Sequence, residues 1–206
     1  MKRILLIDNY DSFTYNVLHL LERACGVPVD IVKNDSIPFF KIGTYSHIVF
    51  SPGPGTPSEW SVLREVIDLC KESHAILGIC LGHQAIAEYF GAKLINLERP
   101  LHGHISSLTI DIEDPVLGLL SKRNQAYNHF NVGLYHSWAV DISSLNNNLK
   151  AGAVNELGIV MTLYHKVFSI YGVQFHPESI NTERGEEIIR SWWESTATTS
   201  RINQAW

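Results

Sequence analysis

Short apolar runs alternate with longer amphipathic segments along the first half of this chain. The apolar runs are rich in Ile, Val and Leu and have the length of buried strands; they cover residues 3–8, 29–33, 47–50 and 75–79. Helix-like segments follow at residues 13–24, 59–73 and 81–90, and Ser58 is the predicted N-cap of the second. Strands that alternate with helices predict an α/β fold, with an open, mostly parallel sheet covered by helices on both faces.

The pattern changes in the second half of the chain. Between residues 101 and 163, short strand-like runs and turns predominate, which predicts antiparallel strands added to the parallel sheet. Residues 182–193 form the last predicted helix, and a polar stretch rich in Ser and Thr begins at Ser195. We therefore predict one domain over residues 1–194 and a loose C-terminal tail over residues 195–206.

One cysteine stands where a predicted strand meets a predicted helix. The local pattern is Gly-x-Cys-x-Gly, formed by Gly78, Cys80 and Gly82. This is the form of a nucleophile elbow, in which a sharp turn between strand and helix lifts one reactive side chain above the sheet. A thiol at a helix N-terminus is also more acidic, because the exposed N–H groups favour thiolate. A lone cysteine after an apolar run is more often a small core residue, but the two glycines favour the nucleophile.

A nucleophilic cysteine needs a base, and the base needs a group to orient it. His176, Pro177 and Glu178 follow the strand-like residues Val173 and Phe175. If the chain is extended there, His176 and Glu178 point to the same side, which predicts a base with its carboxylate. The alternative for His176 alone is a structural histidine at a strand end.

The third candidate element is the loop Ser51-Pro52-Gly53-Pro54-Gly55, which follows a predicted strand. Its two glycines leave backbone N–H groups open to close approach, which suits an oxyanion hole. An isolated loop of this composition would be an ordinary tight turn. Because all three motifs follow strand-like runs, they can meet outside the carboxyl ends of a parallel sheet.

Composition and charge exclude several classes of function. The chain of 206 residues has 16 basic and 21 acidic residues and 45% hydrophobic residues, so it can form a sizeable core and has no basic cluster typical of nucleic-acid binding. No stretch approaches the ~20 apolar residues of a membrane span, and no secretory leader is expected, so we expect a cytoplasmic protein. Three cysteines argue against a disulfide framework. His102 and His104 lack a third ligand at metal-binding spacing, so no metal is expected.

Three motifs together resemble the class I glutamine amidotransferases: residues 77–84 around Cys80, residues 51–55, and residues 174–178. The opening, residues 6–16 with the run Asp8-Asn9-Tyr10-Asp11-Ser12-Phe13, narrows the likeness to the small glutaminase subunits of anthranilate synthase and aminodeoxychorismate (para-aminobenzoate) synthase. The resemblance runs from residue 3 to about residue 193. It implies a flavodoxin-like sheet with extra antiparallel strands.

The resemblance also implies a role for each matching residue. Cys80 would be the nucleophile, His176 the base and later the acid, and Glu178 the group that orients His176. The backbone N–H groups of Gly53 and Leu81 would form the oxyanion hole. The substrate glutamine would be held by a further set: Gly53, Pro54, Gly55, Gln84, Ser137, Trp138 and, at the edge of the pocket, Ser12.

The implied reaction is hydrolysis of L-glutamine through a thioester on Cys80, with release of ammonia and then glutamate. The sequence contains no Gly-x-Gly-x-x-Gly and no Walker-type loop, so we expect the ammonia acceptor on another polypeptide. By resemblance this is a chorismate-binding large subunit that requires Mg²⁺, and no cofactor is expected in this chain. The product, anthranilate or aminodeoxychorismate, stays open.

Two positions depart from the family pattern, and three rival functions stay open. His104 stands where relatives often have lysine, and Trp138 replaces a leucine whose backbone contacts substrate. The rivals are a class I glutaminase serving carbamoyl phosphate or GMP synthesis, a stand-alone cysteine hydrolase acting on peptides or γ-glutamyl chains, and a non-catalytic regulatory subunit. The opening motif argues against the first, and the complete Cys80, His176 and Glu178 set argues against the last.

Overall fold

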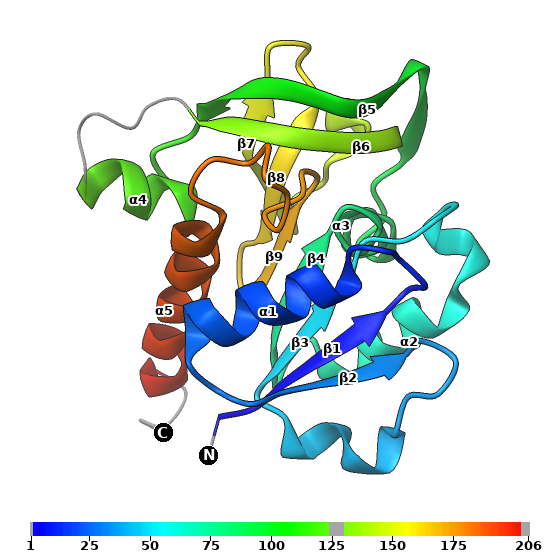
Figure 1. Cartoon of the computed structure of the whole chain (residues 1–206), viewed down its shortest axis with the longest axis vertical. Helices are drawn as coiled ribbons and strands as arrows, with labels where there is room; N and C mark the ends of the chain where they lie inside the picture. The colour runs from blue at the N-terminus through cyan, green and yellow to red at the C-terminus, as the bar shows by residue number, and fades with distance from the viewer. Residues whose placement is uncertain (1, 124–129, 203–206) are drawn as a thin grey trace.

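A computed structural model describes residues 2–123 and 130–202 of the chain. Within these residues the chain forms a nine-stranded sheet in the order β2-β1-β3-β4-β9-β8-β7-β5-β6 (Figure 1). The strands are β1 (Ile4–Asp8), β2 (Val29–Lys33), β3 (His47–Phe50), β4 (Ala75–Ile79), β5 (Leu94–Ile110), β6 (Asn131–Val140), β7 (Leu149–Asn155), β8 (Val160–His165) and β9 (Ile170–Val173). The α-helices are α1 (Thr14–Cys25), α2 (Ser61–Cys70), α3 (Leu81–Tyr89), α4 (Leu117–Arg123) and α5 (Gly185–Ile202), and the 3₁₀ turns are η1 (Phe39–Thr44), η2 (Pro57–Glu59) and η3 (Ile142–Ser144).

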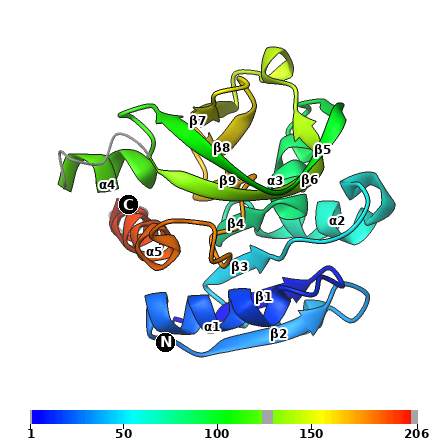
Figure 2. The same cartoon turned by 45° about the horizontal axis from the view of Figure 1, so that its top comes forward.

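The sheet has a parallel part and an antiparallel part, as the sequence predicts. Neighbouring strands among β2, β1, β3, β4 and β9 are parallel, whereas β8, β7, β5 and β6 continue the sheet with antiparallel pairing. The order of the first four strands is that of a flavodoxin-like sheet. In Figures 1 and 2 the long β5–β6 pair lies at the end of the sheet opposite β2.

Helices cover both faces of the parallel part, and the alternation of side chains along β1 shows why. Ile4 and Leu6 belong to the core that packs against α1 and α5. Leu5 and Ile7, which point to the opposite face, belong to the core that packs against α2 and α3. Because a central parallel strand is buried on both sides, it is a continuous apolar run rather than an alternating pattern.

The predicted strand bounds are confirmed for β2, β3 and β4, and β1 begins one residue later than expected. The second helix is shorter than the prediction of 59–73, and Ser58 is not its N-cap. A separate 3₁₀ turn, η2, precedes it, and Thr56 caps this turn in a capping box with Glu59. The carboxylate of Glu59 accepts the backbone N–H of Thr56 at 2.8 Å, so the chain turns before α2 begins.

The predicted loose tail is wrong as far as the structure describes it, because α5 continues across residue 195 to Ile202. Serine and threonine hydroxyls donate to carbonyls of the preceding turn, Ser195 to Trp192 at 2.7 Å and Thr196 to Trp193 at 2.8 Å. His47 of β3 contacts the Thr196 hydroxyl at 2.9 Å, and this contact ties the helix to the sheet. No helix in residues 2–123 and 130–202 is long and apolar enough to cross a membrane.

Candidate active site

Cys80 lies in the turn between β4 and α3 with a strained backbone, φ 51° and ψ −98°. A non-glycine residue with positive φ is uncommon, and such strain is typical of functional turns. The flanking glycines are required by close approach. A Cβ on Gly78 would lie 2.3 Å from the carbonyl oxygen of Gly82, and a Cβ on Gly82 would lie 2.6 Å from Cβ of Phe50. The predicted elbow geometry is therefore confirmed.

His176 and Glu178 contact each other as predicted, but they lie in a turn and not in the extended segment that the sequence suggested. The Nδ1 atom of His176 lies 2.7 Å from Oε1 of Glu178, and the two side chains are only 4% and 0% exposed. The strand β9 ends at Val173, and the N–H of Ser179 donates to the carbonyl of His176 at 3.1 Å. The chain therefore makes a tight turn here, and the expectation of an extended segment is wrong.

The surroundings of His176 favour its protonated form. Burial lowers the pKa of His176, but hydrogen bonds and charge interactions with Cys80 and Glu178 outweigh burial and raise this pKa above its ordinary value. The Glu178 carboxylate accepts from Nδ1–H, which leaves Nε2 as the ring nitrogen available to exchange a proton with Cys80. Burial raises the pKa of the Cys25 thiol to about 12 despite the opposing charges of Arg190 and Lys2, and burial raises the pKa of the Cys70 thiol to about 11.

A cavity of about 160 Å³ opens beside the Cys80 thiol. Its walls come from the Gly53 loop, the start of α3, and the strands β5 and β6. The lining residues are Gly53, Pro54, Gly55, Cys80, Leu81, Gln84, His102, Tyr135, His136, Ser137 and Trp138. The structure thus brings together every residue predicted to bind glutamine except Ser12, which is exposed in the loop before α1 and is not part of the lining.

The Pro52–Gly53 peptide is held so that its N–H is fixed at the cavity wall. The hydroxyl of Ser51 donates to the carbonyl of Pro52 at 2.6 Å and accepts the backbone N–H of Asn9 at 2.9 Å. Since carbonyl and N–H point in opposite directions in a trans peptide, anchoring this carbonyl orients the N–H of Gly53. A Cβ on Gly53 would lie 2.7 Å from Cδ2 of Leu81, so the two residues predicted to form the oxyanion hole pack against each other.

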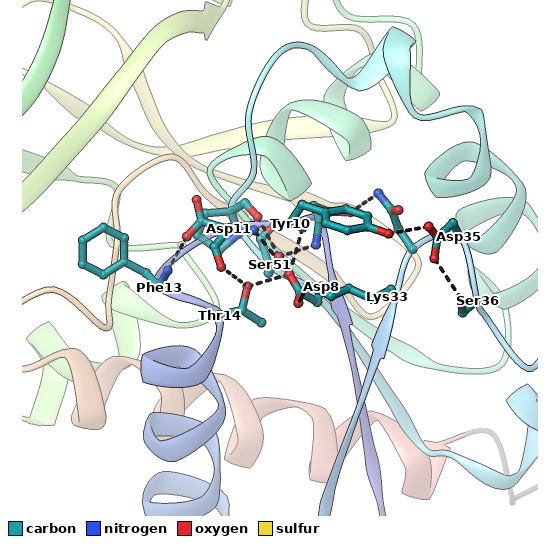
Figure 3. Close-up of polar contacts among 12 residues, drawn as sticks. Asp8, Tyr10, Asp11, Phe13, Thr14, Lys33, Asp35, Ser36 and Ser51 are labelled. Atoms are coloured by element: carbon teal, nitrogen blue, oxygen red, sulfur yellow. Dashed lines mark hydrogen bonds and ion pairs between the residues drawn. The ribbon is translucent and has the colours of Figure 1, made fainter.

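Residues of the opening motif form hydrogen bonds that hold the Ser51–Gly53 loop in place (Figure 3). One carboxylate oxygen of Asp8 accepts the N–H of Tyr10 at 2.8 Å and the hydroxyl of Thr14 at 2.9 Å. The other accepts Lys33 Nζ at 2.5 Å. Burial alone would raise the pKa of Asp8, but these hydrogen bonds and the Lys33 charge lower it overall. These bonds hold the loop that carries Asn9, and Asn9 Nδ2 donates to the carbonyl of Ser51 at 2.8 Å.

The two departures from the family pattern have different positions. His104 lies outside the cavity lining, with its Nε2 3.9 Å from the carboxylate of Glu156. Trp138 lines the cavity, and its carbonyl oxygen accepts from Gln84 Nε2 at 2.8 Å and lies 2.9 Å from Nδ1 of His136. Its backbone is fixed independently of its side chain. In residues 2–123 and 130–202, no group of three His, Cys, Asp or Glu side chains is placed to hold a metal ion.

The family model for glutamine amidotransferase class-I matches residues 5–195. The chain belongs to the class I glutamine amidotransferase family. Relatives in this family include anthranilate synthase component 2 of Pseudomonas putida, 38% identical over 94% of this chain and 97% of that protein. Aminodeoxychorismate synthase component 2 of Klebsiella aerogenes is 38% identical over 92% of this chain and 98% of that protein. A crystal structure from Thermoplasma acidophilum, provisionally assigned to GMP synthase, matches with a TM-score of 0.83 and 27% identity over 99% of this chain and 98% of that one.

We expect the amidotransferase variant Glu178→Gln to lose roughly 10- to 100-fold in glutamine turnover, because a neutral hydrogen bond to His176 replaces a charge-assisted one about twice as strong. Steady-state measurement of glutamate release tests this. Glu183→Gln is the matched control, since this exposed carboxylate contacts Asn131 instead. A loss as complete as that caused by removing the Cys80 thiol would contradict an orienting role.

Proposed function

We propose that this chain hydrolyses L-glutamine through a thioester on Cys80 and delivers the ammonia to a separate, chorismate-using synthase subunit. The observation that carries the proposal is the set of Cys80, His176 and Glu178, with Cys80 in the wall of a cavity lined by all the predicted glutamine-binding residues except Ser12. Full-length similarity to the second components of two chorismate-using synthases supports the choice of acceptor.

The reaction begins when the Cys80 sulfur attacks the side-chain amide carbon of glutamine and His176 holds the thiol proton. The negative oxygen of the tetrahedral intermediate is stabilised by the N–H groups of Gly53 and Leu81. His176 then gives its proton to the departing nitrogen, which leaves as ammonia, and a glutamyl thioester remains. In the second half, His176 takes a proton from water, the hydroxide attacks the thioester, and glutamate leaves with the thiol restored.

The size of the cavity favours a small substrate. At about 160 Å³ it is below the roughly 300–1,000 Å³ of pockets that take drug-sized ligands. This argues against a stand-alone hydrolase of peptides or longer γ-glutamyl chains. Glutamine, with one amide at the end of a short side chain, can reach Cys80 while its α-amino acid group stays near Gln84 and the Ser137–Trp138 backbone.

The acceptor is proposed from the relatives, which include the second components of both synthases. The component 2 proteins of anthranilate synthase and of aminodeoxychorismate synthase share the same identity with this chain, 38%. We therefore propose the chemistry common to both, transfer of ammonia to chorismate bound on a large subunit that carries Mg²⁺. One glutaminase can serve two large subunits if both present the same docking surface.

The test mixes this protein with each candidate large subunit, glutamine, chorismate and Mg²⁺, and identifies the aromatic product by chromatography and mass. Anthranilate alone assigns the chain to the first synthase, aminodeoxychorismate alone to the second, and both products mean a shared subunit. Consumption of glutamine without either product would contradict the chorismate acceptor and favour another acceptor, such as that of GMP or carbamoyl phosphate synthesis.

A further inference from the structure

A buried glutamine lies between the nucleophile and the substrate-binding strand. Gln174 follows β9 and is fully buried. Its Nε2 atom lies 3.6 Å from the sulfur of Cys80, and its Oε1 atom accepts from Nε2 of Gln84 at 3.1 Å. The triad chemistry described above does not use this side chain. Sequence patterns assigned no role to Gln174 beyond its place next to the His176 motif.

The orientation of the Gln174 amide follows from a group that can only accept hydrogen bonds. The carbonyl of Trp138 is such a group, so the atom of Gln84 that approaches it at 2.8 Å is the NH₂. The same NH₂ also faces the Gln174 amide at 3.1 Å, where it requires an oxygen. The NH₂ of Gln174 is therefore the end that faces the Cys80 sulfur.

The position of Gln174 is as well fixed as its orientation. Its backbone N–H donates to the carbonyl of Met161 in β8 at 2.8 Å, so the residue is tied to the sheet. An N–H donor beside sulfur stabilises thiolate more than thiol, because the charged form is the stronger acceptor. An amide has no proton to lose in this pH range, so its NH₂ remains a donor while His176 changes its protonation state.

We propose that Gln174 is a catalytic residue that stabilises the Cys80 thiolate by donating a hydrogen bond to its sulfur. This proposal rests on the role of Cys80 as nucleophile in the proposed function. In this proposal two side chains act on the Cys80 sulfur in different ways. His176 exchanges the proton, and Gln174 stabilises the thiolate before it attacks the amide, while the proton is on His176, and again when the sulfur leaves as thiolate during hydrolysis of the thioester.

Other titratable groups surround this site and must be held constant in the test. They come from the turn after β9 and from the strands β5 and β6, and they are His176 with Glu178 behind it, His102, Tyr135 and His136. Replacing Gln174 leaves all of them in place. A change in the reactivity of Cys80 after this replacement therefore measures the effect of the Gln174 amide.

The test measures how fast iodoacetamide modifies Cys80 in the isolated chain from pH 5 to 10, with each cysteine followed by peptide mass spectrometry. We expect Gln174→Met to slow modification of Cys80 about tenfold near neutral pH and to raise the pH midpoint by about one, the effect of losing one hydrogen bond to a charged group. Gln174→Leu is the second variant, for use if the methionine variant does not fold. Circular dichroism verifies folding of each.

The matched control is Asn155→Leu, which removes a buried amide in β7 that bonds to Ser106 rather than to the site. It should leave the midpoint for Cys80 unchanged. An unchanged rate and midpoint in both folded Gln174 variants would overturn the proposal. If wild-type Cys80 reacts no faster than buried Cys70, the nucleophile assignment itself fails, and the proposal fails with it.

Discussion

Replacing Cys80 with alanine or with glycine is expected to abolish glutamine hydrolysis, while the glycine variant unfolds at a higher temperature than the alanine variant. The loss of activity follows because no thioester can form without the thiol. The difference in stability follows from the backbone at this position, φ 51° and ψ −98°. Alanine keeps a Cβ in this strained conformation, at a cost of about 1–3 kcal/mol, whereas glycine adopts it freely.

The strain that glycine relieves at residue 80 is partly offset by the entropy that glycine loses on folding. Glycine costs about 0.5–1 kcal/mol through the extra freedom of the unfolded chain, so the net gain over alanine is about 1 kcal/mol, or roughly 2–4 °C in melting temperature for a chain of this size. Thermal unfolding followed by circular dichroism measures it. Equal melting temperatures would mean that the turn relaxes without strain.

Two controls separate chemistry from folding in the Cys80 variants. Cys25→Ala should keep full glutamine hydrolysis, because Cys25 is a half-buried thiol at the end of α1. In the complete synthase, ammonium salts should restore product formation by either Cys80 variant, since under the proposed function the large subunit uses the ammonia that this chain would release. Glutamate release by purified Cys80→Ala at more than a trace level would overturn the nucleophile assignment.

The parallel part of the fold was predictable because its central strands, β1, β3 and β4, are buried on both faces. A run such as Ala75–Ile79 has few other stable placements, and the glycines at 78 and 82 mark the turn that follows it. The three motifs met as predicted for the same reason, since the carboxyl ends of β3, β4 and β9 are neighbours in the sheet. Local sequence and topology agreed at these positions.

Features that depend on contacts distant in sequence were not predictable. Composition alone suggested a loose tail, but His47 of β3 contacts the Thr196 hydroxyl at 2.9 Å and packs against Trp192 with ring centroids 5.4 Å apart, and both contacts hold α5 against the sheet. The anchoring of Gly53 by Ser51 and Asn9 joins two loops 42 residues apart. The role of Gln174 likewise depends on Gln84, 90 residues away. No local sequence pattern predicts contacts between residues so far apart in the chain.

His176→Ala is expected to reduce glutamine turnover by about 10²–10⁴-fold, the usual contribution of one positioned acid and base. In the wild type the imidazolium persists above the ordinary histidine pKa of 6.5, because Cys80 and Glu178 raise the pKa of His176 despite its burial. The acid that protonates the leaving ammonia therefore stays available as the pH rises past 6.5. The wild-type rate should accordingly change little across neutral pH.

The variant should have a different pH profile as well as a lower rate. Without His176 no side chain takes the thiol proton, so the residual rate should rise with pH as the Cys80 thiol loses its proton to solvent. The rate of glutamate release between pH 6 and 9 tests this. His165→Ala is the control, because His165 is a buried histidine that packs on Phe168 and does not line the cavity. A variant that keeps more than a tenth of wild-type turnover with a level profile would show that another group is the base. The Gln174 amide cannot replace this function, because it can stabilise a thiolate but cannot carry the proton from sulfur to the leaving nitrogen.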